Sequence, residues 1–155
     1  MNLRKATLDD MDELVKIRLG YLNIDFKDMS KHQEKQIKEE LQVYFMEHLG
    51  RDFMAYIAEE NGEIVSSVFL VMIEKPANPN FMTGKIGNVL NVFTKPEYRR
   101  QGLANRLLKT MIEEAKSKRI SYLELMATEQ GYPLYKKLGF EEAKSHAVAM
   151  KLDLL

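Results

Sequence analysis

The sequence predicts an α/β protein built on a mixed, mostly antiparallel twisted sheet with helices on both faces. Two apolar runs rich in strand-forming residues flank Asn61-Gly62, a pair typical of a tight antiparallel hairpin. From Ile86 onward the pattern alternates strand, helix, strand, helix, strand. A chain of 155 residues fits one core, so we expect a single domain over 1–155.

Composition excludes several classes of protein. The 23 basic and 23 acidic side chains give a net charge of zero, whereas a nucleic-acid reader needs a basic face. With no Cys, the chain has no disulfide scaffold, thiolate metal site or cysteine nucleophile, and its three scattered His predict no metal site. No apolar run approaches the ~20 residues that cross a bilayer, and no leader pattern opens the chain, so we expect a cytoplasmic protein.

The N-terminal third is predicted to be mainly helical. A short strand, Leu3–Lys5, precedes Thr7-Leu8-Asp9-Asp10, which has the pattern of a capping box. A helix is expected from about 8 to 20, and Ser30 is placed to cap a second helix that ends at Gly50. The residues that recur at helical spacing are, in the first helix, Met11, Leu14, Val15 and Ile17, and in the second, Ile37, Leu41, Tyr44, Phe45 and His48.

Strands follow. Met54–Glu60 and Ile64–Ile73 are expected to pair across the Asn61-Gly62 turn, and Lys75–Gly84, which holds two Pro, is a loop. Ile86–Thr94 is a further strand that carries two amides, Asn88 and Asn91. These amides either hold acceptor groups or satisfy the backbone at a bulge, and the sequence does not decide between the two.

The last third contains one strongly amphipathic helix that opens at Gly102. Tyr122–Met126 is expected to be a strand, Pro133–Leu138 a short helix closed by Gly139, and Ala147–Leu152 a terminal strand. The apolar face of the long helix consists of Leu103, Leu107, Leu108, Met111, Ile112 and Ala115.

The segment Asn88–Asn105 predicts an anion site. A strand leads through a basic turn to Gly102, and the first N–H groups of the following helix lack intrahelical partners. A glycine at that turn lets phosphate oxygens approach the backbone, and Arg99 and Arg100 add charged donors. The segment lacks the glycines of a Walker A loop and of a dinucleotide fingerprint.

Two blocks of this sequence resemble the GCN5-related N-acetyltransferase (GNAT) family. Arg99-Arg100-Gln101-Gly102-Leu103-Ala104 is similar to its acetyl-CoA motif, Gln/Arg-x-x-Gly-x-Gly/Ala, and Leu134–Phe140 resembles its Leu-Tyr-x-x-Leu-Gly-Phe ending. The resemblance implies a GNAT-like sheet of roughly six to seven strands with about four helices. The recognisable motifs cover Ile86–Phe140, and the topology covers the whole chain.

The resemblance also implies which residues hold acetyl-CoA, the cosubstrate, in a reaction without a metal. Pantetheine is expected along the end of the fourth strand, at Val92, Phe93 and Thr94, and the pyrophosphate on the loop and helix start. Family members often place an Asn after the fifth strand, and Ala127-Thr128-Glu129-Gln130 has none. The expected phosphate-binding residues are Arg99, Arg100, Gln101, Gly102, Leu103, Ala104 and Asn105.

Two residues are implied for catalysis. Tyr135 corresponds to the family tyrosine that protonates the departing CoA thiolate; its alternative role is packing in an apolar stripe with Leu134 and Leu138. Glu124 lies beside the cofactor strand, where some relatives keep a general base; its alternative is an outward polar residue of an alternating strand.

The sequence therefore predicts an acyl-CoA-dependent N-acetyltransferase that moves acetyl to a primary amine by direct attack in a ternary complex. The expected acceptor is a small-molecule or peptide amine. We expect no nucleic-acid or membrane partner, and the sequence leaves open whether the protein forms a homodimer. Two alternatives are a catalytically silent acyl-CoA sensor and a protein-interaction module. Release of CoA over an amine panel separates the first from an enzyme, and a complex without CoA affinity would indicate the second.

Overall fold

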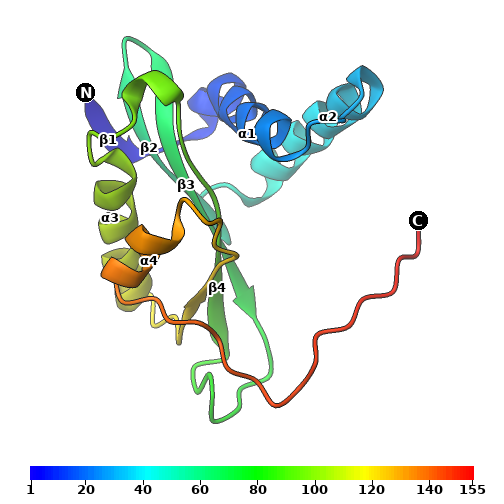
Figure 1. Ribbon diagram of the computed structural model, residues 1–155, viewed down its shortest axis with the longest axis vertical. Coiled ribbons are helices and arrows are strands. Elements are labelled where there is room, and N and C mark those ends of the chain that lie inside the picture. Colours follow the sequence, from blue (N-terminus) through cyan, green and yellow to red (C-terminus); the bar gives the residue numbers. More distant parts are fainter.

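The computed structural model describes all residues, 1–155, and is built around one five-stranded sheet (Figure 1). The strands follow chain order across the sheet: β1 (Asn2–Lys5), β2 (Phe53–Glu60), β3 (Glu63–Glu74), β4 (Lys85–Thr94) and β5 (Leu123–Glu124). The helices are α1 (Met11–Asp25), α2 (Lys31–His48), α3 (Leu103–Ser117) and α4 (Tyr132–Lys137), with 3-10 turns at Leu8–Asp10 and Pro96–Tyr98. None of the helices is long and apolar enough to span a membrane.

The sheet is mixed, as predicted. β1 to β4 pair antiparallel, whereas β4 and β5 pair parallel after the α3 crossover. The turn at Asn61 (φ 52°) and Gly62 (φ 79°) confirms the expected hairpin, since both central residues of such a turn need a positive φ.

Alternation along the strands separates two cores, one on each face of the sheet. In β2, Met54, Tyr56 and Ala58 pack with α3, whereas Phe53, Ala55 and Ile57 pack with α1 and α2. Figure 1 shows the same division, with α3 and α4 on one side of the sheet and α1 and α2 on the other. The predicted helices on both faces are therefore confirmed.

The N-terminal helix is longer than the sequence predicted. The Thr7 capping box with Asp10 is present, but α1 begins at Met11 and continues past Gly20 to Asp25. A Cβ at Gly20 would lie 3.8 Å from Phe93, an ordinary van der Waals contact, so this stretch of the helix is packed on the sheet. Packing against the sheet outweighs the ~1 kcal/mol that a glycine costs inside a helix. The second helix has the expected Ser30 cap, reciprocated by Gln33.

Two strand predictions are wrong: one strand is shorter than predicted, and the other does not form. The strand expected at Tyr122–Met126 is reduced to Leu123–Glu124, because only two residue pairs join it to β4 before the chains separate. Ala147–Leu152 alternates as a strand would, but in this chain it has no neighbouring strand to complete a ladder and is fully exposed. The sheet consequently has five strands instead of six to seven.

Candidate active site

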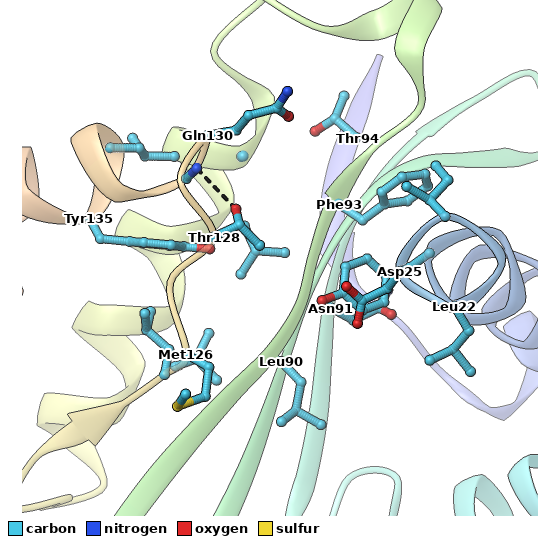
Figure 2. A pocket seen from close by; sticks show the side chains of 18 of the residues that line it. Leu22, Asp25, Leu90, Asn91, Phe93, Thr94, Met126, Thr128, Gln130 and Tyr135 are labelled. Carbon is cyan, nitrogen blue, oxygen red and sulfur yellow. Dashed lines mark hydrogen bonds between the residues drawn. The ribbon is translucent and has the colours of Figure 1, made fainter. Parts of the chain in front are cut away.

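The main candidate site of the fold is a cleft where β4 and β5 separate. They pair only at Gly87–Leu123 and Asn88–Glu124, and beyond these pairs the strands enclose a cleft of about 650 Å³. Figure 2 shows Tyr135, Thr128 and Gln130 on one wall and Leu90, Asn91 and Thr94 on the other. Because α1 and α4 cover opposite faces of the sheet and both line the cleft, it opens toward both faces.

A β-bulge at Asn91 bends β4 at this point. Asn91 has φ +50° and is 3% exposed, and the register with β3 shifts between Ser67 and Phe69. The Ser67 hydroxyl donates to the Asn91 carbonyl (3.0 Å) and accepts from its amide nitrogen (2.9 Å), while Arg18 donates to the amide oxygen (3.2 Å). Of the two alternatives that the sequence left open for Asn91, the structure supports the bulge.

The bulge sets which backbone groups face the cleft. The Lys95 N–H donates to the Val65 carbonyl, and Phe93 pairs with Ser67, so these residues turn their backbone groups toward β3. Successive residues of a strand point their backbone groups to opposite sides. Val92 and Thr94 therefore present theirs toward the open side, which β5 does not reach.

The segment for which the sequence predicts an anion site forms a loop that leads into the start of α3. Gly102 caps the helix in the left-handed conformation (φ 74°) with no side-chain cap, and its carbonyl accepts the first helical bond, from Arg106. Arg100 also has a positive φ (62°), so two residues of this loop take the left-handed conformation just before the helix begins. The Arg99 Nε donates to the Thr94 carbonyl (3.0 Å) and thereby ties this loop to the end of β4.

These residues fit the phosphates of a CoA cosubstrate. A Cβ built at Gly102 has no atom within 4 Å, so an open space lies beside the backbone where a side chain would otherwise stand. The uncapped N–H groups of the first turn, at Leu103, Ala104 and Asn105, have no intrahelical acceptors. The arrangement combines a helix N-terminus, a bare backbone and flanking arginines.

Tyr135 lies in the cleft as expected, on the short helix α4. Its ring is 8% exposed and packs edge-on against Phe140, with ring centroids 5.8 Å apart. Burial raises the pKa of the Tyr135 hydroxyl to about 12. The ring also lies close to Gly131, where an added Cβ would be 2.8 Å from it. The side chain thus packs and at the same time lines the cleft, so the two roles weighed from sequence are compatible.

The other residues predicted for the site lie at different distances from the cleft that Tyr135 lines. Val92, Phe93, Thr94, Arg99 and Ala104 line the cleft, whereas Glu124 is exposed and is not part of its lining. Glu124 as a general base stays a prediction. Asn105 turns its side-chain oxygen into a buried position without a hydrogen-bond partner, so only its backbone N–H fits the anion site.

The sequence reading missed the contribution of α1. Arg18, Tyr21 and Asp25 line the cleft at helical spacing, on the stretch of α1 that reaches and passes Gly20. Arg18 stacks over the Tyr21 ring at 5.9 Å, and burial lowers the pKa of its guanidinium. The polar residues at positions 18, 21 and 25 follow helical spacing, but Gly20 was read as the end of the helix. Thr128, which accepts from the Gly131 N–H (3.1 Å), was also not predicted.

The site combines the cleft between β4 and β5, the uncapped N-terminus of α3 and the Tyr135 hydroxyl. This combination is typical of a protein that binds an acyl-CoA thioester for transfer. Residues 51–142 match the family model described as an acetyltransferase (GNAT) domain. The chain belongs to the GNAT family. It is an acyl-CoA-dependent N-acetyltransferase, and acetyl-CoA is the donor.

Known proteins resemble the chain along nearly all of its length. An N-alpha-acetyltransferase of Sulfurisphaera tokodaii is 29% identical over 153 residues, covering 92% of this chain and 81% of the relative. The N-alpha-acetyltransferase daf-31 of Caenorhabditis elegans is 28% identical over 169 residues, covering 99% and 83%. A predicted acetyltransferase from Clostridium acetobutylicum, solved with acetyl-CoA, is 32% identical with a TM-score of 0.83, covering 97% and 95%.

Proposed function

We propose that the acceptor is the α-amine at the N-terminus of a peptide or protein. The observation that carries this proposal is a second hollow, of about 700 Å³, which shares Leu22, Asp25 and Phe26 with the cleft. It continues between the end of α1 and α2, as far as Ile37. A small amine would fill only the cleft, whereas an extended peptide with its terminus in the cleft would also occupy this hollow.

The residues at the junction suit such a ligand. The Asp25 carboxylate lies where the two hollows meet and can attract an ammonium group. Phe26, 57% exposed, offers an apolar surface to the side chains that follow the terminus. Two relatives named N-alpha-acetyltransferase support the same class of acceptor.

An α-amine also suits a cleft whose predicted base, Glu124, lies outside the lining. An α-ammonium has a pKa of about 8, compared with about 10.4 for lysine, so at pH 7 roughly a tenth of it is already the free base. Such an acceptor needs only water or a nearby carboxylate to take its proton. A lysine acceptor would need a much stronger base.

We assign the following roles to the chain's own residues. The amides of the α3 start, with Arg99 and Arg100, hold phosphates, and the backbone of Val92 and Thr94 orients the pantetheine arm. Acetyl-CoA supplies a thioester carbonyl that a free amine can attack. The N–H groups of β4 at the splay polarise the carbonyl oxygen, and the Tyr135 hydroxyl donates to the departing sulfur.

Transfer is direct, in a ternary complex. The chain has no cysteine to take up the acetyl group, and the cleft lining contains neither serine nor histidine. No covalent acetyl-enzyme is therefore part of the proposal.

The test is CoA-thiol release from acetyl-CoA with a panel of three amine types. The panel comprises a peptide with a free α-amine, the same peptide with a blocked N-terminus and a free lysine, and small polyamines. We expect release with the first and at least ~100-fold less with the others. Preference for the lysine peptide or the polyamines would overturn the acceptor assignment, and no release with any amine would favour the silent sensor.

A further inference from the structure

Arg18 is a half-buried arginine that has no carboxylate partner. Its only side-chain hydrogen bond runs from Nη1 to the neutral amide oxygen of Asn91, at 3.2 Å. A guanidinium has five N–H donors, so most of its donors have no partner in the chain. Arg4, the other half-buried arginine, bonds to both Asp10 and Glu59. Arg18 therefore lacks the counter-charge that usually accompanies a charge taken out of water.

The burial of Arg18 is not compensated from within the cleft. Desolvation lowers the pKa of its guanidinium, and the charge of Asp25 opposes this effect only from a distance. Seven residues separate the two on α1, which is two turns, or about 10 Å along the helix axis. Glu129, the other carboxylate of the cleft lining, makes no ion pair with Arg18 either. The guanidinium thus lacks an anionic partner that a bound carboxylate would supply.

The guanidinium is held on the acceptor side of the cleft, close to the place proposed for the thioester. Its helix, α1, packs on the face of the sheet opposite α3. The side chain contacts Asn91, which directly precedes Val92, a residue whose backbone we assign to the pantetheine arm. The Tyr21 ring, 5.9 Å from the guanidinium carbon, restricts the orientation of the guanidinium. A group bound to Arg18 is therefore close to the amine that attacks.

We propose that Arg18 binds a carboxylate in the side chain of the acceptor's first residue, so that preferred acceptors begin with Asp or Glu. The inference rests on the proposed function, a peptide α-amine. Only the first residue lies beside the reacting amine, because each further extended residue adds about 3.3 Å. The planar guanidinium matches the two oxygens of a carboxylate, whereas an amide of similar shape has no charge to pair with it.

A purely structural role for Arg18 predicts different kinetics. If Arg18 only held the Asn91 amide at the bulge, its replacement would slow all acceptors by the same factor. If Arg18 binds the acceptor, the loss falls on acidic peptides and the other peptides keep their rates. The ratio of rates for two peptides that differ only in that charge therefore separates the two roles.

The first experiment measures kcat/KM by CoA release for two peptides that are identical except for a first residue of Asp or Asn. We expect the wild-type protein to prefer the Asp peptide by at least ~10-fold, and Arg18→Gln to reduce the ratio to about 1. Arg18→Lys, which keeps the charge but not the fork of donors, should retain part of the preference. Lys16→Gln is the matched control, because it removes the same charge from an exposed position of α1 and should keep the wild-type ratio.

The outcomes distinguish this inference from the proposed function on which it rests. Equal rates with both peptides in the wild-type protein, or the same ratio in Arg18→Gln, would overturn the role of Arg18 and leave the α-amine assignment standing. Free alanine is included because its own carboxylate lies beside its amine. Faster release with free alanine than with either peptide, or no release with the peptides, would contradict both proposals.

The second experiment does not depend on turnover. Calorimetry compares the two acetylated products, which begin with N-acetyl-Asp and N-acetyl-Asn, as they bind to the protein saturated with CoA. We expect the Kd of the N-acetyl-Asp peptide to be at least ~10-fold lower in the wild-type protein and the two Kd values to be equal in Arg18→Gln. Wild type and variant should bind CoA alike, which checks that the cleft is retained. Equal affinities for the two products in the wild-type protein would overturn the proposal.

Discussion

Tyr135 combines two properties that a donor to sulfur needs, a position in the cleft and a firmly held proton. Burial raises the pKa of its hydroxyl to about 12, so the phenol stays protonated throughout the range in which an α-amine loses its proton. Full proton transfer to a thiolate would be uphill, because a thiol has a pKa of about 8.5. In the proposed mechanism, the contribution of Tyr135 is therefore mainly a hydrogen bond to the charge that develops on sulfur.

This shift predicts the shape of the pH profile. We expect kcat/KM with an N-terminal peptide to rise about tenfold per pH unit up to about pH 8 and then to stay level to pH 10. With an ordinary pKa of about 10, half of the phenol would be ionised at pH 10 and the rate would fall. Steady-state kinetics from pH 6 to 10 measures this, and a falling limb that begins near pH 9 would contradict the protonated phenol.

Removing the hydroxyl tests the role directly. Tyr135→Phe keeps the ring contact with Phe140, so the fold and CoA binding should be retained while kcat falls by about 10–10⁴-fold. Tyr132→Phe is the matched control, three residues away on the same helix, where the hydroxyl contacts only Glu142. CoA release at saturating acetyl-CoA and calorimetric binding of CoA provide the two readouts. Wild-type turnover in Tyr135→Phe would leave this residue with packing alone.

Gly102 tests the anion site. Gly102→Ala places a methyl group in the space beside the helix start, so we expect the Kd for CoA to rise at least ~10-fold. The substitution also costs about 1–2 kcal/mol of stability, because φ is 74°. Gly62→Ala is the control: φ is 79°, no atom lies within 4 Å, and the site is in the hairpin. An equal CoA affinity in both variants would place the phosphates elsewhere.

The residues of the site were predictable where a motif carries them. Gly102, Arg99 and Tyr135 stand in two short blocks whose local backbone geometry the sequence indicates, so their positions could be predicted, and their roles stay predictions. The residues of α1 have no such local signal, because their place in the cleft depends on the helix continuing through Gly20, which packing against the sheet decides. The unpaired oxygen of Asn105 could not be foreseen either, since burial of one side-chain atom depends on tertiary packing.

At the scale of the elements, the bulge in β4 creates the cleft. It changes which backbone groups point away from β3, and the bonds from Ser67 and Arg18 to Asn91 hold it in place. Without the bulge, β4 would continue in register, and Val92 and Thr94 would turn toward β3.

Asn91→Ala should therefore both destabilise the fold and impair binding. It removes buried hydrogen bonds and leaves an alanine at φ +50°, for a loss of about 2–4 kcal/mol in unfolding free energy. The KM for acetyl-CoA should rise as the cleft-facing backbone loses its support. Urea denaturation and initial rates measure the two effects. Asn88→Ala, a half-buried neighbour in regular strand, should change stability by less than about 1 kcal/mol.

Helices and turns could be predicted where the hydrogen bonds and caps that form them come from residues close together in the sequence. The hairpin, the Thr7 capping box, the Ser30 cap and α3 each have their signals within a few residues, and all were confirmed. β5 and the C-terminal segment depend on a neighbour. Alternation in Ala147–Leu152 indicates extended chain, but only a partner edge turns extended chain into a strand, and the sequence of one chain does not show where that edge lies.

At the scale of the whole molecule, binding of acetyl-CoA should raise the free energy of unfolding and with it the melting temperature. A ligand at 100 times its Kd adds about 2.7 kcal/mol, which corresponds to roughly 5–11 °C for a chain of this size. Differential scanning fluorimetry with acetyl-CoA titrated to millimolar concentration measures the shift. No shift in the wild-type protein would contradict the proposed binding residues, and Gly102→Ala should need a higher concentration for the same shift.

The division of the core by alternate residues of β2 matters for protein engineering. The side chains that face α1 and α2 form one hydrophobic cluster and those that face α3 form another, so core substitutions on the two sides should combine additively. Core residues of either cluster could then be redesigned while the other cluster is kept, whereas Tyr21, Asp25 and Thr94 line one shared cleft and have to be varied together. The sheet acts as a partition between two separately adjustable halves of the core.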